Sequence, residues 1–292
     1  MAGFAYVAPS SIDEAVAVLA EHAGQGLKAQ VIAGGTDLLV QMRSLNKAAR
    51  TIVDIKKIGE TGRLDIGADE TFIGAGICCA ALHESDELKA LFPGLLESAD
   101  LIGSTQIQGR ATLGGNLCNA SPAGDTIPAM IANAGVCVIA GPGGRRELPV
   151  EDFVVGVGRN ALQDGEFLVG LKFPNPKAAT ADAYLRFIPR TEMDIAVAGA
   201  GVRITLDADG TCTEARVAIG AVAPTAILVP AAASALVGSK VDAGALDAAA
   251  AACSQAASPI TDKRGTIEYR RRVVGVLCKR AGAIARDRAI SR

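Results

Sequence analysis

The sequence predicts an α+β protein made of three consecutive parts, because the pattern of its segments changes twice along the chain. Residues 1–58 alternate between strand and helix patterns, as an α/β unit does. Residues 59–175 turn to short strands separated by glycines, with helices between them. Residues 176–292 follow a linker-like Pro-Asn-Pro segment and run from alternating strands into alanine-rich helices. We therefore expect a separate, smaller α+β domain there.

The first part is predicted to begin with a capped helix. Ser11 and Glu14 have the spacing of a capping box, in which two side chains satisfy free N–H groups at a helix start, and an apolar helical face follows. A short buried strand over residues 31–33 then leads through a glycine pair into a helix over 38–43. A second strand over 51–55 completes the α/β unit.

The second part is predicted to surround one long loop with short strands and two helices. The stretch 105–128 is rich in Gly, Asn, Ser and Pro, and a loop of this length inside a compact domain is commonly functional. The other expected elements, including the strands of the third part, are strands over 64–67, 71–76, 136–140, 167–173, 195–206 and 214–222 and helices over 80–91 and 94–102.

The bulk composition excludes several classes of function. The formal net charge is −2 and half of the residues are apolar, so neither nucleic acid nor an anionic membrane surface is expected as a partner. The opening residues 1–6 lack the pattern of a secretion signal, and no apolar run reaches the roughly 18 residues of a membrane span. We therefore expect a cytoplasmic protein without an integral membrane segment.

The residues that usually carry metals or nucleophilic chemistry are scarce. Seven cysteines lie scattered without C-x-x-C spacing, which favours neither a disulfide framework nor an iron–sulfur or zinc site. His22 and His83 are the only histidines, so a Ser-His-Asp site has little to be built from. No catalytic side chain and no metal site are predicted, and the chemistry is expected to come from a bound cofactor.

A first candidate binding motif follows the strand over 31–33. Glycines directly after a strand let the backbone approach a ligand, and the helix that follows offers unpaired N–H groups to a phosphate. The same glycines would also suit an ordinary strand-to-helix turn, and neither a Rossmann nor a P-loop signature is met. The motif consists of Ile32, Ala33, Gly34, Gly35, Thr36, Asp37 and Leu38.

A second glycine pair lies about eighty positions further along the chain. Gly114 and Gly115 are bracketed by Thr112 and Asn116, whose small side chains can donate hydrogen bonds to phosphate oxygens, and Asp125 is an acceptor suited to ribose or ribityl hydroxyls. A turn before a helix is the alternative explanation of this motif alone. Together the two motifs favour a dinucleotide.

The order of these motifs, with others along the chain, resembles one protein family. The further matching positions are Phe4, Tyr6, Pro9, Gln106-Ile107, Ala111, Leu113, Ser121-Pro122, the segment 186–196, Asp262, Arg264-Gly265 and Tyr269-Arg270. The chain resembles, over nearly its whole length, the FAD-binding medium subunit of the molybdenum hydroxylases, the group of carbon monoxide dehydrogenase and xanthine dehydrogenase. This resemblance implies a two-lobed FAD-binding domain of the vanillyl-alcohol oxidase or PCMH type, with lobes at 1–58 and 59–175, followed by the smaller domain at 176–292.

The resemblance also implies positions for the cofactor. Residues 32–38 and 112–116 correspond to two loops around the FAD pyrophosphate, and Asp125 to a carboxylate on the sugar-alcohol side of the flavin. Among the side chains expected near the isoalloxazine ring are Leu168 and Ile195, with Ile102 on the other face, and Arg186 in the place of a lysine of xanthine dehydrogenase relatives.

Besides Arg186, three residues depart from the family pattern. Gln108 and Gly109 replace the usual Arg-Asn before Arg110, which removes a charge beside the phosphate loop. Met193 replaces an acidic residue common in relatives, a change that bears on how an external acceptor meets the flavin.

The function implied by the resemblance is electron transfer within a complex. FAD would be bound non-covalently, molybdopterin would lie on a large partner subunit and [2Fe–2S] clusters on a small one, and the assembly would be a dimer of heterotrimers. The alternatives are a stand-alone FAD-dependent oxidase or reductase of the same superfamily, and a scaffold subunit that has lost its flavin. The substrate and the electron acceptor are left open by the sequence.

Overall fold

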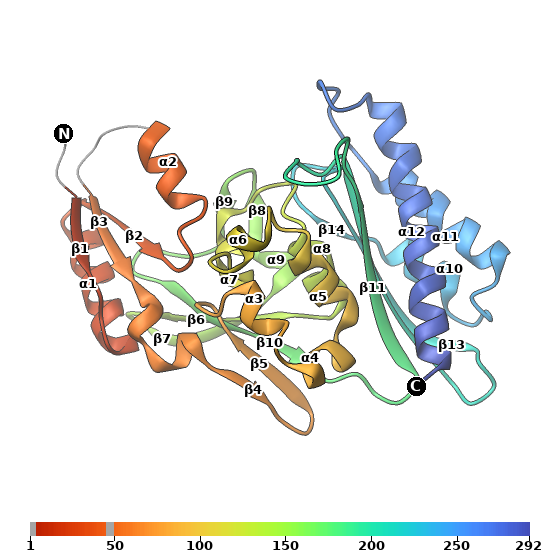
Figure 1. The fold of residues 1–292 in the computed structure, drawn as a ribbon, viewed down its shortest axis with the longest axis horizontal. Coiled ribbons are helices and arrows are strands. Elements are labelled where there is room, and N and C mark those ends of the chain that lie inside the picture. The colour runs from red at the N-terminus through yellow and green to blue at the C-terminus, as the bar shows by residue number, and fades with distance from the viewer. Residues whose placement is uncertain (1–3, 45–49) are drawn as a thin grey trace.

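The computed structural model describes residues 4–44 and 50–292, and its N-terminal sheet is parallel (Figure 1). Ser11 caps the first helix, because its hydroxyl accepts a hydrogen bond from the backbone N–H of Glu14 at 3.2 Å. The Glu14 carboxylate turns to the N–H of Ser10 instead of Ser11, so the capping box is displaced by one residue. The strand order is β1-β3-β2, with elements β1 (Phe4–Val7), α1 (Ile12–Gly24), β2 (Lys28–Ile32), α2 (Leu38–Ser44) and β3 (Arg50–Asp54).

The second sheet is antiparallel and has the order β4-β5-β10-β6-β7. Short helices lie over one of its faces (Figure 1). Buried phenylalanines pack between these helices and the sheet, and the ring centroids of Phe92 and Phe173 are 5.8 Å apart. The elements are η1 (Ile55–Lys57), η2 (Gly59–Gly62), β4 (Leu64–Ile66), β5 (Glu70–Gly74), α3 (Cys79–Leu82), α4 (Asp86–Leu91), α5 (Pro93–Asp100), α6 (Thr105–Gln108), α7 (Leu113–Asn119), α8 (Thr126–Ala132), β6 (Val136–Gly141), β7 (Gly144–Pro149), α9 (Val150–Phe153), β8 (Val154–Gly156), β9 (Arg159–Asn160) and β10 (Phe167–Pro174).

Two expectations for this region were wrong. The stretch 105–128 is not one long loop, because α6, α7 and the start of α8 lie within it. Helix α7 forms because Thr112 caps it and because Leu113 and Leu117 are buried, which stabilises a segment of poor helix formers. The expected helix over 80–91 is divided into α3 and α4, since Ser85 caps a new helix by accepting the N–H of Leu88 at 3.1 Å.

The third sheet forms a separate α+β unit with its own hydrophobic core. Its strands are antiparallel in the order β11-β12-β13-β14, and α12 packs along β11 and β12 (Figure 1). The strand expected from residue 195 begins only at 198, because Met193 has a φ of +51° and the chain bends there. The elements are β11 (Thr180–Phe187), β12 (Ala198–Leu206), β13 (Cys212–Gly220), β14 (Ile227–Leu228), α10 (Pro230–Leu236), α11 (Ala243–Ala256) and α12 (Ile267–Ile290).

A buried carboxylate joins the second and third sheets. Asp182 on β11 accepts hydrogen bonds from the backbone N–H groups of Gly94 (3.0 Å) and Leu95 (2.9 Å) in the first turn of α5. It also accepts the side-chain amide of Asn133 at 2.6 Å, and its own backbone carbonyl accepts Arg288 of α12 at 2.9 Å. The third unit therefore caps a helix of the second.

Two further predictions concern membranes and cysteines. No helix within residues 4–44 and 50–292 has the length and apolar character needed to cross a bilayer. Of the opening residues weighed as a secretion signal, 1–3 lie outside the described residues. All seven cysteines are free thiols, and five of them are buried.

Candidate functional site

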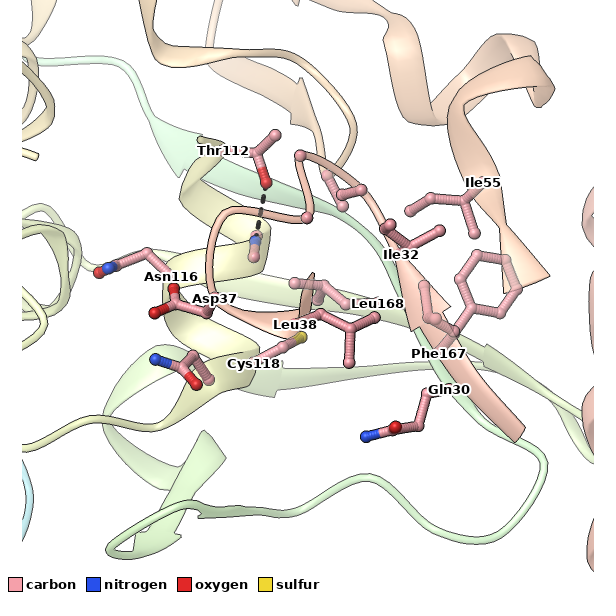
Figure 2. Close-up of a pocket in the computed structure, with 18 of the residues that line it drawn as sticks. Gln30, Ile32, Asp37, Leu38, Ile55, Thr112, Asn116, Cys118, Phe167 and Leu168 are labelled. Atoms are coloured by element: carbon pink, nitrogen blue, oxygen red, sulfur yellow. Dashed lines mark hydrogen bonds between the residues drawn. The ribbon is translucent and has the colours of Figure 1, made fainter. Parts of the chain in front are cut away.

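A cavity of about 580 Å³ lies between the N-terminal parallel sheet with the loop that follows β2, on one side, and elements of residues 75–168, on the other. Figure 2 shows side chains from both motifs around it, among them Ile32 and Leu38 from the first and Thr112 and Asn116 from the second. A volume of this size is within the range of small-molecule and cofactor sites. The two motifs, far apart in sequence, thus form one site.

The glycine pair of the first motif is required by close packing. A Cβ on Gly34 would lie 1.8 Å from the backbone carbonyl oxygen of Arg110, so the first motif touches the main chain just before the second. Gly35 has a φ of +79°, a left-handed backbone conformation that residues with a Cβ rarely adopt. Lys56 holds the loop from the other side, since its Nζ donates to the Ala33 carbonyl at 2.9 Å and to Asp54 at 2.7 Å.

The first motif presents a row of free backbone donors. Within the part of the chain that the structure describes, the N–H groups of residues 34–38 donate to no protein acceptor, and all five residues line the cavity. Consecutive unpaired N–H groups in a turn form a concave anion site, because each carries a partial positive charge. The arrangement is suited to the oxygens of a phosphate or diphosphate.

The second motif is held in place by its own side chains. The Thr112 hydroxyl accepts the N–H of Gly115 at 2.8 Å, which leaves its O–H proton for another acceptor. The Asn116 amide oxygen accepts the hydroxyl of Thr126 at 2.8 Å, so its NH₂ group is fixed at the cavity wall. Gly114 packs on Ala75 too closely for a side chain, since a Cβ would lie 2.7 Å from the Ala75 Cβ.

Three of the residues predicted for the site do not line this cavity. They are Asp125, Arg186 and Ile195, and their contact with a cofactor stays a prediction. The predicted residues that do line it are Ile32, Ala33, Gly34, Gly35, Thr36, Asp37, Leu38, Ile102, Thr112, Gly114, Gly115, Asn116 and Leu168.

Asp125 and Arg186 form a buried ion pair beside the cavity. Arg186 Nη1 donates to Asp125 Oδ2 at 2.6 Å, and the Tyr184 hydroxyl donates to Oδ1 at 3.2 Å. Burial raises the pKa of Asp125 to about 6, although Arg186 and Tyr184 act in the opposite direction. Arg186 Nε is buried without a partner in the described chain, which leaves one donor for a ligand. The pair adjoins the cavity through Thr126, which follows Asp125 and contacts Asn116.

Ile195 lies at the surface with 52% of its area exposed. Its N–H donates to the preceding Asp194, whose carboxylate also accepts Arg190 and Arg264 at 3.3 and 3.2 Å. These contacts join the bend at Met193–Asp194, before β12, to the turn that contains Arg264, before α12. The apolar side chain is thereby presented outward, next to Met193.

Sequence reasoning missed several polar residues of the cavity wall. Gln30, Gln41, Asn119 and Asn160 line it together with Phe167. For Gln30, Gln41 and Asn119 the signal was proximity to the motifs, within a few positions, whereas Asn160 is far from both motifs in sequence and gave no such signal. Within residues 4–44 and 50–292 no cluster of His, Cys, Asp and Glu has the composition of a metal site.

Glu166, another wall residue, is paired with Arg146. Its carboxylate accepts Arg146 Nε and Nη2, each at 2.7 Å, and the N–H of Gln163 at 2.7 Å. These contacts hold the pKa of Glu166 below its usual value of 4.5. The interaction therefore stabilises the fold above pH 4.5 and is lost as the pH falls through the lowered pKa.

Glu166→Gln is expected to lower the free energy of unfolding at pH 7 by about 1–2 kcal/mol, because a charge-assisted pair is replaced by a neutral one. The deficit should shrink as the pH falls through the lowered pKa of Glu166, because the wild-type carboxyl becomes protonated there as well. Urea unfolding from pH 3 to 7 measures this difference. A deficit that is the same at every pH would contradict the assigned role.

Comparisons with known proteins agree with this geometry. Residues 2–176 match the family described as the FAD binding domain in molybdopterin dehydrogenase, and residues 183–284 match the CO dehydrogenase flavoprotein C-terminal domain. The carbon monoxide dehydrogenase medium chain of Afipia carboxidovorans is 33% identical over 98% of both chains. The xanthine dehydrogenase FAD-binding subunit of Escherichia coli is 30% identical over 94% of this chain and 93% of its own.

Solved structures show the same fold. Reconstituted CO dehydrogenase from Oligotropha carboxidovorans superimposes with a TM-score of 0.92 at 32% identity, covering 99% of both chains. Carbon monoxide dehydrogenase from Hydrogenophaga pseudoflava gives 0.90 at 34% identity over 98% of both. The chain therefore belongs to the FAD-binding medium subunits of the molybdenum hydroxylases, the flavoprotein components of oxidoreductase complexes.

Proposed function

We propose that this chain carries non-covalently bound FAD in a heteromeric molybdenum hydroxylase and passes electrons from the [2Fe–2S] clusters of a small subunit to an external acceptor. The observation that carries the proposal is the row of free N–H groups at residues 34–38, facing the second glycine motif across one cavity. The names of the related proteins, which are medium chains and FAD subunits of such enzymes, support it.

The residues of the cavity fit an FAD molecule. The free N–H groups and the hydroxyl of Thr112 suit its diphosphate, while Ile32, Ile102 and Leu168 offer apolar wall to its rings. The buried, unpartnered Nε of Arg186 and the carboxylate of Asp125 suit the polar groups of the flavin side. When bound, FAD supplies the capacity to take up and release electrons singly or in pairs. The protein side chains hold the cofactor and limit the access of water.

The assembly proposed around this chain contains a large molybdopterin-binding subunit and a small [2Fe–2S] subunit. We place two such heterotrimers in a dimer and the complex in the cytoplasm. Relatives along the full length of the chain are named as one subunit of several, which supports the heteromeric part of this proposal. Co-purification of tagged protein with its partners, followed by mass measurement of the intact complex, tests the stoichiometry.

Gly115→Val is expected to lower the FAD content at least tenfold while the fold is kept. Gly115 lines the cavity, and a Cβ there would meet only the Thr112 hydroxyl, at 2.9 Å, so added methyl groups would occupy cofactor space without displacing main chain. The ratio of flavin to protein absorbance measures FAD, and circular dichroism with a thermal melt measures the fold.

Gly143→Val is the matched control, because no atom lies within 4 Å of a Cβ at that position and Gly143 is not among the residues that line the cavity. Equal FAD content in the Gly115 variant and the wild type would count against the site. Turnover of an organic substrate by the isolated chain would favour a stand-alone oxidase or reductase instead.

A further inference from the structure

We propose that Gln41 and Asn119 form a clasp between the two lobes that holds the cavity closed and sets the rate at which FAD leaves. The inference rests on the proposed function, since it takes FAD as the occupant of the cavity. Gln41 Nε2 donates to Asn119 Oδ1 at 3.0 Å, and both side chains line the cavity. The hydrogen bond thus lies in the wall of the site.

The clasp is a second contact between the segments that carry the two motifs. Helix α2 carries Gln41 and continues from the first glycine motif, while α7 contains the second motif and ends at Asn119. The motifs touch at one point through the main chain of Gly34 and Arg110. The side chains of Gln41 and Asn119 join the two helices at another. Separating the lobes at the cavity requires this hydrogen bond to break.

Helix α7 is packed into the core, whereas helix α2 is not. Helix α7 is anchored by buried Leu113 and Leu117, and the residue after it, Ala120, accepts the N–H of Gly158 at 2.9 Å. None of the side chains at residues 38–43 is buried, and Leu39 is 48% exposed. Helix α2 stands away from the sheets (Figure 1), and within the described residues it packs extensively on no other helix or strand. The clasp therefore ties a loosely packed helix to a fixed one.

The glycine pair before α2 gives this helix a hinge. Only Thr36 and Asp37 separate Gly34 and Gly35 from the start of α2, and glycine backbone changes conformation at low cost. Movement of α2 away from α7 would open the cavity beside the free N–H groups. A neutral hydrogen bond of this kind shifts an equilibrium about 2- to 10-fold, so its loss should speed release of the cofactor by that factor.

The test uses the full-length chain loaded with FAD and follows release after dilution by the rise in flavin fluorescence. Gln41→Met keeps the side-chain length but removes the donor, and Asn119→Ala removes the acceptor. We expect each variant to release FAD about 2- to 10-fold faster than the wild type. The double variant should be no faster than the faster single one, because both changes break the same bond.

Gln25→Ala is the matched control and should leave release unchanged. In the part of the chain that the structure describes, the Gln25 side chain donates to Glu21 of α1, at 3.2 Å. Effects that add in the double variant would overturn the clasp, because they would mean that each residue contacts FAD independently. Wild-type release rates in both single variants would overturn it as well. Failure of the wild-type chain to bind FAD would instead refute the proposed function.

Discussion

Gly34→Ala is expected to abolish FAD retention and to destabilise the chain at the same time. The added Cβ would lie 1.8 Å from the carbonyl oxygen of Arg110, and this neighbour is main chain that cannot rotate away. Forcing a methyl group into such a contact costs about 1–3 kcal/mol and moves the backbone. The two motifs would separate, and the free N–H groups would no longer face the second motif. Flavin absorbance of the purified protein and urea unfolding of the apoprotein measure the two effects.

Gly24→Ala is the control for this substitution. Gly24 ends α1, and nothing lies within 4 Å of a Cβ there, so the change should be neutral or slightly stabilising. A Gly34→Ala protein that kept FAD and wild-type stability would show that the motifs are not packed as described. The contrast with Gly115→Val is informative, because that variant should lose FAD at a smaller cost in stability, since its Cβ meets the Thr112 hydroxyl and no main chain.

Asp182→Ala is expected to lower the free energy of unfolding by about 3 kcal/mol or more. The carboxylate accepts two backbone N–H groups of α5 and the amide of Asn133, all of them buried. Each buried donor left without an acceptor costs about 1–3 kcal/mol. Because α5 ends just before Ile102 in the cavity wall, the variant should also bind FAD more weakly. Urea unfolding and FAD titration measure these effects.

Asp65→Ala provides the comparison, since the Asp65 side chain is 59% exposed and lies 3.9 Å from Arg63. Surface pairs of this kind contribute at most about 1 kcal/mol. Asp182→Asn should fall between the wild type and Asp182→Ala, because an amide oxygen can still accept one of the N–H groups. Equal stability of the Asp182→Ala protein and the control would refute the capping of α5 by the third unit.

The predicted elements that proved right depend on local chemistry. The helix after Ser11 is an example, because its cap and its apolar face lie within a few residues of each other. The expected loop over 105–128 was wrong, because its many Gly, Asn, Ser and Pro residues hide a helix that needs the burial of Leu113 and Leu117. The strand expected from Ile195 begins three residues later, at Ala198, for a similar reason. Asp194 is bound there by Arg264, far along the chain, and the backbone bends.

Short-range pattern was thus sufficient to identify two glycine motifs and to suggest a phosphate ligand, since backbone freedom at glycine and donors at a helix start are properties of a few adjacent residues. It was not sufficient to show that Gly34 rests on the carbonyl of Arg110 or that Gln41 reaches Asn119. These contacts join segments far apart in the chain. They arise from the way the lobes pack, which depends on the shape of the whole core, and no window of neighbouring residues contains that information.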